Sequence, residues 1–119
     1  GDSYLNTISG NVGIGTTAPA YPLEVNGNIG FTAVAKGLVL KQGANGKCGT
    51  FVLNGTTPVT VANTSVQISD CIVFSLNTVG GTVGAYPTIQ TITAATGFTV
   101  AGTASDTSTM NYIVISNAA

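Results

Sequence analysis

The stretch "CGTFVLNGTTPVTVANTSVQISDCIVFSL", residues 48–76, decides the fold class. Apolar and polar residues alternate in "PVTVA" and "SVQIS", and a period of two is typical of a strand that buries one face. Asn54-Gly55 precedes one such run and predicts a tight turn, because both residue types tolerate the positive φ of a type I′ turn. We therefore expect strands over 50–53 and 57–62, joined as a hairpin.

The same signals recur along the rest of the chain. Asn26-Gly27 and Asn45-Gly46 predict two further hairpins, and "GFTVA" near the C-terminus alternates like "PVTVA". No stretch places apolar residues at the i, i+3, i+4, i+7 spacing of a helix. The sequence predicts an all-β protein with an antiparallel β-sandwich or jelly-roll-like domain. The two additional hairpins would pair strands over 22–25 with 28–33, and over 38–41 with 48–52.

Two runs differ from the others because they are apolar on both faces. In "CIVFSL", residues 71–76, and "YIVI", residues 112–115, large apolar residues occupy successive positions. A strand that is apolar on both faces is covered on both faces. One face of a small sandwich meets its own core, so the other face predicts contact with a second subunit. The candidate interface residues are Tyr112, Ile113 and Ile115.

The composition changes near residue 45. Residues 1–44 are broken by Pro19, Pro22 and several glycines and offer little to fill a core, whereas the later strands carry three of the four phenylalanines. We expect a stem-like β segment over 1–44 and a C-terminal β-sandwich tip over 45–119. A core-poor stem and strands that are apolar on both faces together predict a homotrimer, whose closed symmetry buries these surfaces.

The charge content excludes several function classes. The chain has three Lys, no Arg, no His and a net charge of −1, so it lacks the basic groups that nucleic acid requires. No apolar run approaches the roughly 20 residues that span a bilayer, and we expect no membrane insertion.

No catalytic or metal-binding set can be assembled from this sequence. Without His, neither a Ser-His-Asp nor a Cys-His set can form, and two thiols alone cannot complete a zinc site. The four carboxylates, Asp2, Glu24, Asp70 and Asp106, are scattered along the chain, and a glycosidase-like pair of Asp70 with Asp106 is disfavoured. We therefore expect no enzyme activity, no cofactor and no metal.

The glycines of "GIGTTA", residues 13–18, match a loose dinucleotide-binding pattern. Such a loop requires a helix directly after it, whose amides face the phosphate. Pro22 would break a helix in its second turn, and no βαβ unit surrounds the motif. The glycines instead indicate turns and close backbone packing.

Cys48 and Cys71 both lie in strand-like apolar runs. Two readings remain open: buried free thiols that pack as small hydrophobes, and a disulfide between neighbouring strands.

The ligand-binding candidates are Tyr86, Asp106 and Thr107. Tyr86 lies in a loop flanked by Gly and Pro, where an exposed ring could stack on a sugar or dock a protein, or could simply cover the core edge. Asp106 heads "DTST", in which an Asx-type turn leading into the last strand is the simpler reading and a ligand contact is the alternative.

Two segments carry a resemblance to known proteins. "GNVGIGTTAPAYPLEVNGNI", residues 10–29, resembles a short stem motif of phage tail-fibre and related surface proteins. The C-terminal half, up to "ASDTSTMNYIVI" at 104–115, resembles a small β-module near the ends of viral and prophage fibre-like proteins.

This resemblance implies a trimeric, all-β fibre tip at the virion surface. Its function would be non-enzymatic attachment to a host cell-surface receptor, with a glycan as one candidate receptor, through three weak binding sites. The alternative is a carbohydrate-binding or adhesin β-module of a cellular surface protein, which would be monomeric. A capsule depolymerase is disfavoured because the catalytic residues are missing.

Overall fold

The structure is a computed structural model that describes residues 10–117. Every regular element in this range is a β-strand, which confirms the all-β prediction. The contacts divide the chain after Leu38, so that one unit ends there and the other begins at Val39. We call residues 10–38 the N-terminal unit and residues 39–117 the β-domain. The predicted division at residue 44 into a stem and a tip stays a prediction.

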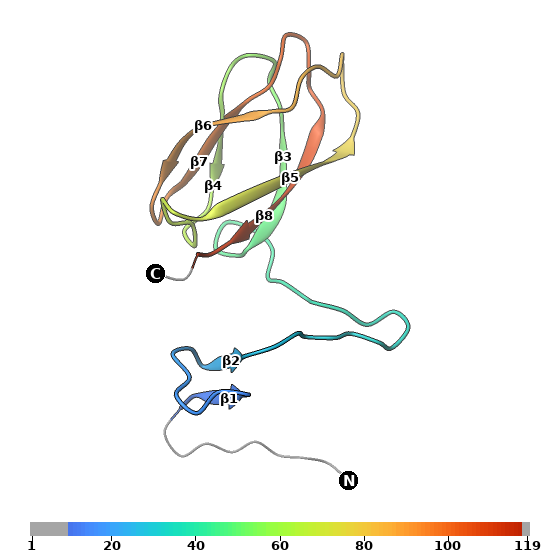
Figure 1. Ribbon diagram of the computed structural model, residues 1–119. Coiled ribbons are helices and arrows are strands. Elements are labelled where there is room, and N and C mark those ends of the chain that lie inside the picture. The colour runs from blue at the N-terminus through green and yellow to red at the C-terminus, as the bar shows by residue number, and fades with distance from the viewer. Residues whose placement is uncertain (1–9, 118–119) are drawn as a thin grey trace. The chain divides into compact units, whose positions relative to one another are not determined.

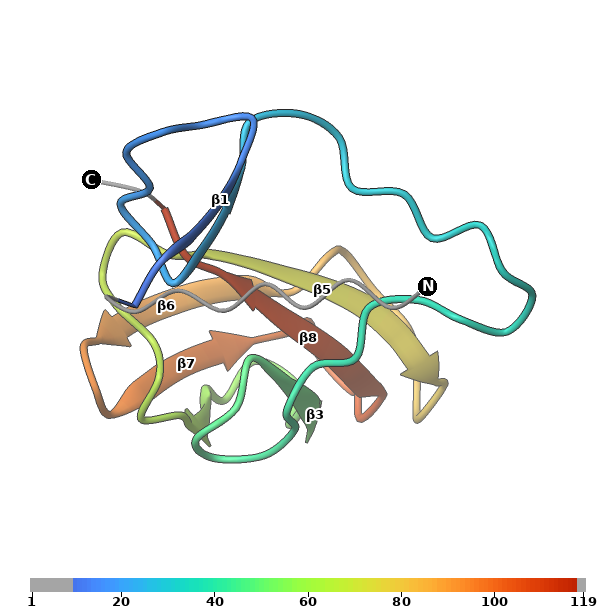
Figure 2. The ribbon, with the colours of Figure 1, turned by 90° about the horizontal axis from the view of Figure 1, so that it is seen from below.

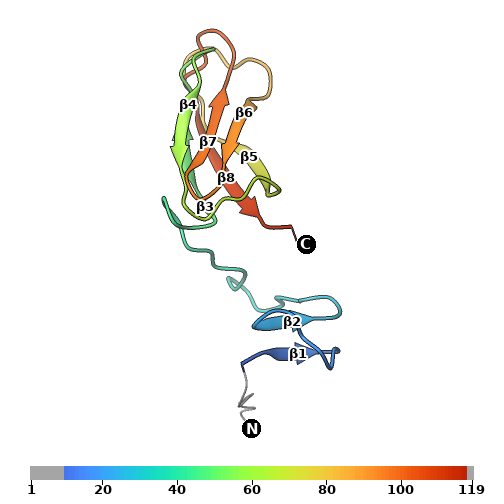
Figure 3. The same ribbon diagram turned by 90° about the vertical axis from the view of Figure 1, so that its left-hand side faces the viewer.

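The β-domain is a sandwich of two three-stranded antiparallel sheets. In one sheet the middle strand β8 lies between β3 and β5, as Figure 2 shows; in the other the middle strand β7 lies between β4 and β6, as Figure 3 shows. The bounds are β3 Cys48–Val52, β4 Val59–Ala62, β5 Cys71–Thr78, β6 Thr88–Thr93, β7 Gly97–Ala101 and β8 Thr109–Ile115 (Figure 1).

An aromatic cluster fills the space between the two sheets. Phe51 and Phe74 meet edge to face with ring centroids 5.2 Å apart, and Phe98 and Tyr112 do the same at 5.3 Å. Edge-to-face pairs of this kind stabilise beyond the area that they bury. The remaining buried apolar side chains surround these rings: Leu53, Val61, Val66, Val100, Met110 and Val114. The alternation predicted for residues 59–62 and 97–101 is confirmed, because Val61, Phe98 and Val100 point into this core.

The Asn-Gly hairpins predicted from the sequence are wrong in their pairing. Asn54-Gly55 does form a turn, with Gly55 at φ 57° and a bridge from Asn54 to Thr57. The turn, however, carries the chain from β3 in one sheet to β4 in the other. β3 pairs with β8 and β4 pairs with β7 instead, so that Phe51 and Val61 enter the core from opposite layers.

Three predicted strands are absent from the described residues. The chain over 28–33 and 38–41 is irregular, and "SVQIS" at 65–69 forms a loop. That loop still buries Val66 completely while Ile68 is exposed. Its alternation therefore reflects one residue anchored in the core and not a strand.

A buried asparagine ties the irregular segment before β3 to the chain that follows β4. Asn63 is fully buried; its Nδ2 donates to the Gly46 carbonyl at 2.9 Å, and its Oδ1 accepts from the Ser65 amide at 2.9 Å. Lys47 donates to the Ser65 carbonyl at 2.8 Å and lies 3.8 Å from Asp70. These contacts satisfy polar groups that burial would otherwise make costly.

The N-terminal unit contains a short parallel pair in place of the predicted hairpin. β1 Val12–Ile14 pairs with β2 Leu23–Val25, so that Val12 lies opposite Leu23 and Ile14 opposite Val25. Within residues 10–38 no side chain is buried, although Leu23, Ile29, Phe31 and Val34 are large and apolar. Taken by itself, this unit has no core.

The two cysteines are free, and one part of their prediction is wrong. Cys71 is exposed and Cys48 is partly buried, so they are not a pair of buried thiols. Cys48 lies on β3 and Cys71 on β5, with β8 between them. The two positions are therefore separated by about 10 Å across two strand spacings. A disulfide within one domain, which needs Cα atoms within about 7 Å, does not fit this arrangement.

Candidate functional site

Two loops at one end of the β-domain form the candidate site. One loop joins β5 to β6 over residues 79–87, and the other joins β7 to β8 over residues 102–108. The Thr107 amide donates to the Gly80 carbonyl at 3.0 Å, and the Thr82 amide donates to the Ser105 carbonyl at 2.9 Å. Glycine is needed at position 80, because a Cβ there would collide with the Thr107 carbonyl. These contacts hold the loops together at the end of the sandwich away from the C-terminal end of β8 (Figure 1).

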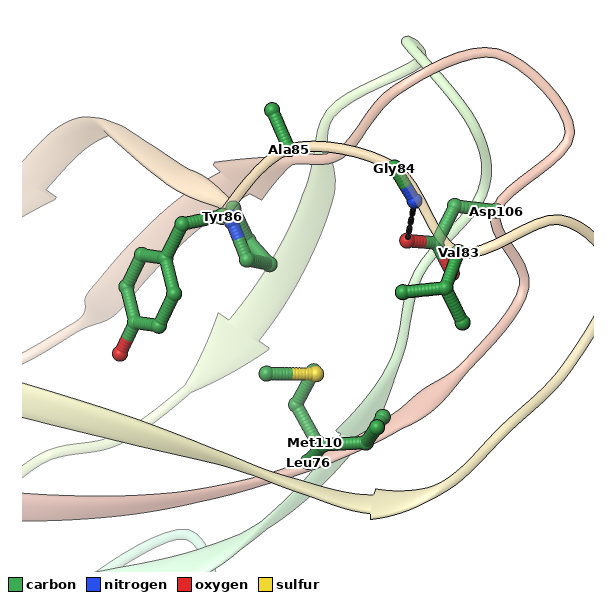
Figure 4. A pocket seen from close by; sticks show the side chains of 8 residues that line it. Leu76, Val83, Gly84, Ala85, Tyr86, Asp106 and Met110 are labelled. Carbon is green, nitrogen blue, oxygen red and sulfur yellow. Dashed lines mark hydrogen bonds between the residues drawn. The ribbon is translucent and has the colours of Figure 1, made fainter.

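A pocket of about 160 Å³ opens beside these loops. Figure 4 shows Tyr86 on one side of it, Val83 and Asp106 on the other, and Leu76 and Met110 below. Most of the wall is apolar, and its residues come from β5, the 79–87 loop, the 102–108 loop and β8: Leu76, Val83, Gly84, Ala85, Tyr86, Pro87, Asp106 and Met110.

Asp106 is the charged group of the pocket wall, and its carboxylate is already occupied. The side chain is only 2% exposed. Its Oδ1 accepts from the Ser108 amide at 3.0 Å, and its Oδ2 accepts from the Gly84 amide at 3.3 Å. Asp106 thus forms the expected Asx-type turn and also fastens the second loop to the first.

These hydrogen bonds favour the ionised carboxylate. The Ser108 hydroxyl and then the Ser108 amide hold the pKa of Asp106 below the ordinary value of 3.8; burial acts against them, and the Gly84 amide adds a smaller effect in their favour. The carboxylate therefore serves the geometry of the loops, and its near-complete burial leaves little of its surface for a ligand to contact.

Tyr86 is a fixed wall of the pocket. Its hydroxyl donates to the Phe74 carbonyl at 2.8 Å, and its ring stacks on the Phe74 ring with centroids 6.3 Å apart. Even so, the side chain is 65% exposed. An aromatic surface held in place in this way loses little conformational freedom when a ligand packs against it.

The structure brings two of the three predicted ligand residues into one pocket. Tyr86 and Asp106 both line it, whereas Thr107 is exposed on the 102–108 loop and is not part of the wall. Leu76, Val83 and Met110 were not predicted as site residues. The apolar character of 71–76 was a signal for Leu76, but nothing in the sequence placed Met110 beneath the same loop.

The predicted interface residues divide between the two sides of β8. Tyr112 points into the domain's own core and is almost fully buried. Ile113 and Ile115 point the other way, onto what we call the outer face of the β3-β8-β5 sheet. There Ile113 lies between Cys48 and Val73 in register, and Ile115 lies opposite Cys71. The interface role of these residues stays a prediction.

Asp70 and Asp106 do not form a hydrolytic pair. Asp70 precedes β5 and Asp106 precedes β8, and these strands are antiparallel neighbours. The two groups therefore lie at opposite ends of the sheet, on the order of 20 Å apart for strands of this length. A glycosidase pair requires about 5 to 9 Å. The Glu24 carboxylate accepts a hydrogen bond from the Ala20 amide at 2.7 Å, and Asp2 lies outside the described residues.

Neither a metal-binding cluster nor a membrane-spanning helix is found within residues 10–117. No group of three or more His, Cys, Asp or Glu side chains in this range could hold a metal ion. The same range contains no helix long and apolar enough to cross a membrane.

One comparison with known proteins finds a match. Residues 45–115, more than half of the chain, match the family model described as K1 capsule-specific polysaccharide lyase, C-terminal domain. The match covers all six strands of the β-domain and the whole pocket. No curated protein and no solved structure matches the chain significantly. The segment over 10–29 lies outside the matched range, so its resemblance to fibre stems stays a prediction.

Proposed function

We propose that this chain, which belongs to the family of K1 capsule-specific polysaccharide lyase C-terminal domains, is a non-enzymatic attachment module of a phage tail spike or fibre. It would act at the virion surface as a homotrimer and bind a receptor on the host cell. The family match carries this proposal, because it concerns the C-terminal domain of a protein that acts on a bacterial capsule.

The β-domain supports the non-enzymatic part of the proposal. The pocket wall contains one carboxylic acid, Asp106, and its two oxygens already accept hydrogen bonds from Ser108 and Gly84. A general acid or base must exchange a proton with a substrate. A pocket built in this way is suited to binding.

Two surfaces support association of copies. The N-terminal unit leaves large apolar side chains exposed and buries none of its residues 10–38. The outer face of the β3-β8-β5 sheet exposes Val73 and Ile115 and carries no charged residue on its strands. Closed three-fold symmetry would cover both surfaces and would present three pockets on one assembly.

Binding to cells tests the attachment function. The fluorescently labelled chain is incubated with a panel of encapsulated bacterial strains and their capsule-free derivatives, and bound label is measured against protein concentration. We expect saturable binding to at least one strain and no release of oligosaccharides from its capsule. Absence of binding throughout the panel would count against attachment, and release of oligosaccharides would reveal an enzyme. The heat-unfolded chain serves as the control for non-specific adsorption.

A further inference from the structure

We infer that the pocket between the 79–87 and 102–108 loops takes one aliphatic or aromatic side chain of a protein at the host surface. The inference rests on the proposed attachment function, for which it specifies the receptor chemistry. It also narrows the expectation that Tyr86 binds either a sugar or a protein.

The charge of the pocket selects an uncharged group. No lysine lines the pocket, and Asp106 is the one charged residue in its wall. A carboxylate, phosphate or sulfate entering there would meet a negative charge with no cation to offset it. A cation would find the Asp106 oxygens already accepting hydrogen bonds from Ser108 and Gly84. A neutral occupant avoids both costs.

The polar groups of the pocket do not suit a sugar. Sites that orient a ligand through hydroxyl groups rely on several convergent polar groups. Here the wall contains no Ser, Thr, Asn, Gln, Lys or Arg side chain. The Tyr86 hydroxyl is committed to the Phe74 carbonyl. A sugar would thus have its ring faces covered but would find no free side-chain donor in the wall for its hydroxyl groups.

The size of the pocket selects a single compact group. Its volume of about 160 Å³ is close to that of an apolar protein cavity that holds benzene. A Leu, Met or Phe side chain could fill it against the Tyr86 ring, with Leu76 and Met110 below. A lipid chain would need a longer groove.

Methionine offers a direct reporter of occupancy. Met110 is the one methionine of the chain, so a protein labelled with ¹³C at the methionine methyl group gives a single methyl signal from the pocket wall. The signal is followed while N-acetyl-leucinamide, benzene or methyl β-glucoside is added to the full chain. We expect saturable shifts with the first two probes and none with the glucoside.

A matched pair of variants tests whether the shift comes from this pocket. Val83 and Val79 both lie in the 79–87 loop and are both exposed, but only Val83 lines the pocket. Val83→Asp should weaken leucinamide binding by at least about tenfold, because it places a second negative charge beside an apolar ligand. Val79→Asp should leave binding within about twofold of the original. Circular dichroism melting establishes that both variants are folded.

Several results would overturn the inference. No shift with leucinamide up to its solubility limit would do so, as would equal saturable shifts with the glucoside or unchanged binding by folded Val83→Asp. These probes are measured without cells, so their failure would leave cell attachment standing. Conversely, probe binding without attachment to any strain would refute the proposed function and leave the pocket's chemistry intact.

Discussion

Replacing Ile113 with Asp should separate the proposed trimer into folded monomers. Ile113 is the middle residue of a row across the outer face of the β3-β8-β5 sheet, between Cys48 and Val73. Its side chain points away from the core, whereas its neighbours Tyr112 and Val114 are buried in it. The substitution therefore changes a surface of the single domain and leaves the aromatic core in place.

The magnitude follows from the burial that association would add. Full burial of an Ile side chain is worth about 1.5 to 3 kcal/mol. Ile113 is already partly covered in the single chain, so association would contribute about 1 kcal/mol per copy and about 3 kcal/mol per trimer. That loss alone weakens association by about a hundredfold. Each buried, unpaired carboxylate costs several kcal/mol more, so the variant should not associate at micromolar concentration.

Sedimentation velocity over a concentration series measures the result. The original chain should sediment at three times its 11.8 kDa mass, and the Ile113→Asp variant at the mass of one chain. Ile68→Asp is the control, because Ile68 is 72% exposed in the 65–69 loop and lies outside the outer face. A trimeric Ile113→Asp variant with an unchanged melting temperature would show that this row is not an interface. A monomeric original chain would refute the homotrimer itself.

Two further changes test the hydrogen bonds made by two buried polar side chains, Asp106 and Asn63. Asp106→Asn should lower the melting temperature at pH 7, because the depressed pKa of Asp106 means that its carboxylate stabilises the folded state once ionised. This contribution is present above the unfolded pKa and is lost as the pH falls through the folded pKa. The melting temperatures of the variant and the original chain should therefore converge below about pH 4. A difference in melting temperature that persists unchanged to pH 2 would contradict the role assigned to the carboxylate. Asn63→Ala should cost about 2 kcal/mol in urea unfolding, since the Ser65 amide loses its acceptor and the buried Gly46 carbonyl keeps only the Ser65 hydroxyl as a donor. Exposed Asn54→Ala should cost much less, and equal losses would show that the Asn63 contacts contribute little.

The sequence predicted the strands of the β-domain better than it predicted their partners. Alternation identified Val61, Phe98 and Val100 as core residues, because a strand that packs on one side has an apolar residue at every second position. The pairing of strands produces no comparable pattern in the sequence. Asn54-Gly55 marks a turn correctly, but whether the turn closes a hairpin or crosses between sheets depends on β7 and β8, which lie more than 40 residues further along the chain.

The same limit explains what was missed at the candidate site. Tyr86 and Asp106 each carried a local signal, a loop aromatic beside Pro and an Asx turn. Their convergence depends on backbone hydrogen bonds between Gly80 and Thr107 and between Thr82 and Ser105. These contacts require glycine at position 80, where a Cβ would collide with the Thr107 carbonyl, but a glycine in the sequence does not reveal which distant backbone it approaches. Met110 was unpredictable for a related reason, since an inward residue of β8 becomes part of a pocket wall only where the loop above leaves space.

The chemistry inferred for the pocket bears on why the proposed module would act as a trimer. One compact apolar group in an open pocket of about 160 Å³ supplies little affinity once the cost of association has been met. Three pockets on one assembly would make the second and third contacts intramolecular, and this can raise the apparent affinity by roughly 10² to 10⁴. Ile113 and Val83 should then affect attachment to cells in different ways. Loss of the trimer should abolish firm attachment while Met110 still reports the same single-site binding of leucinamide, whereas Val83→Asp should weaken both.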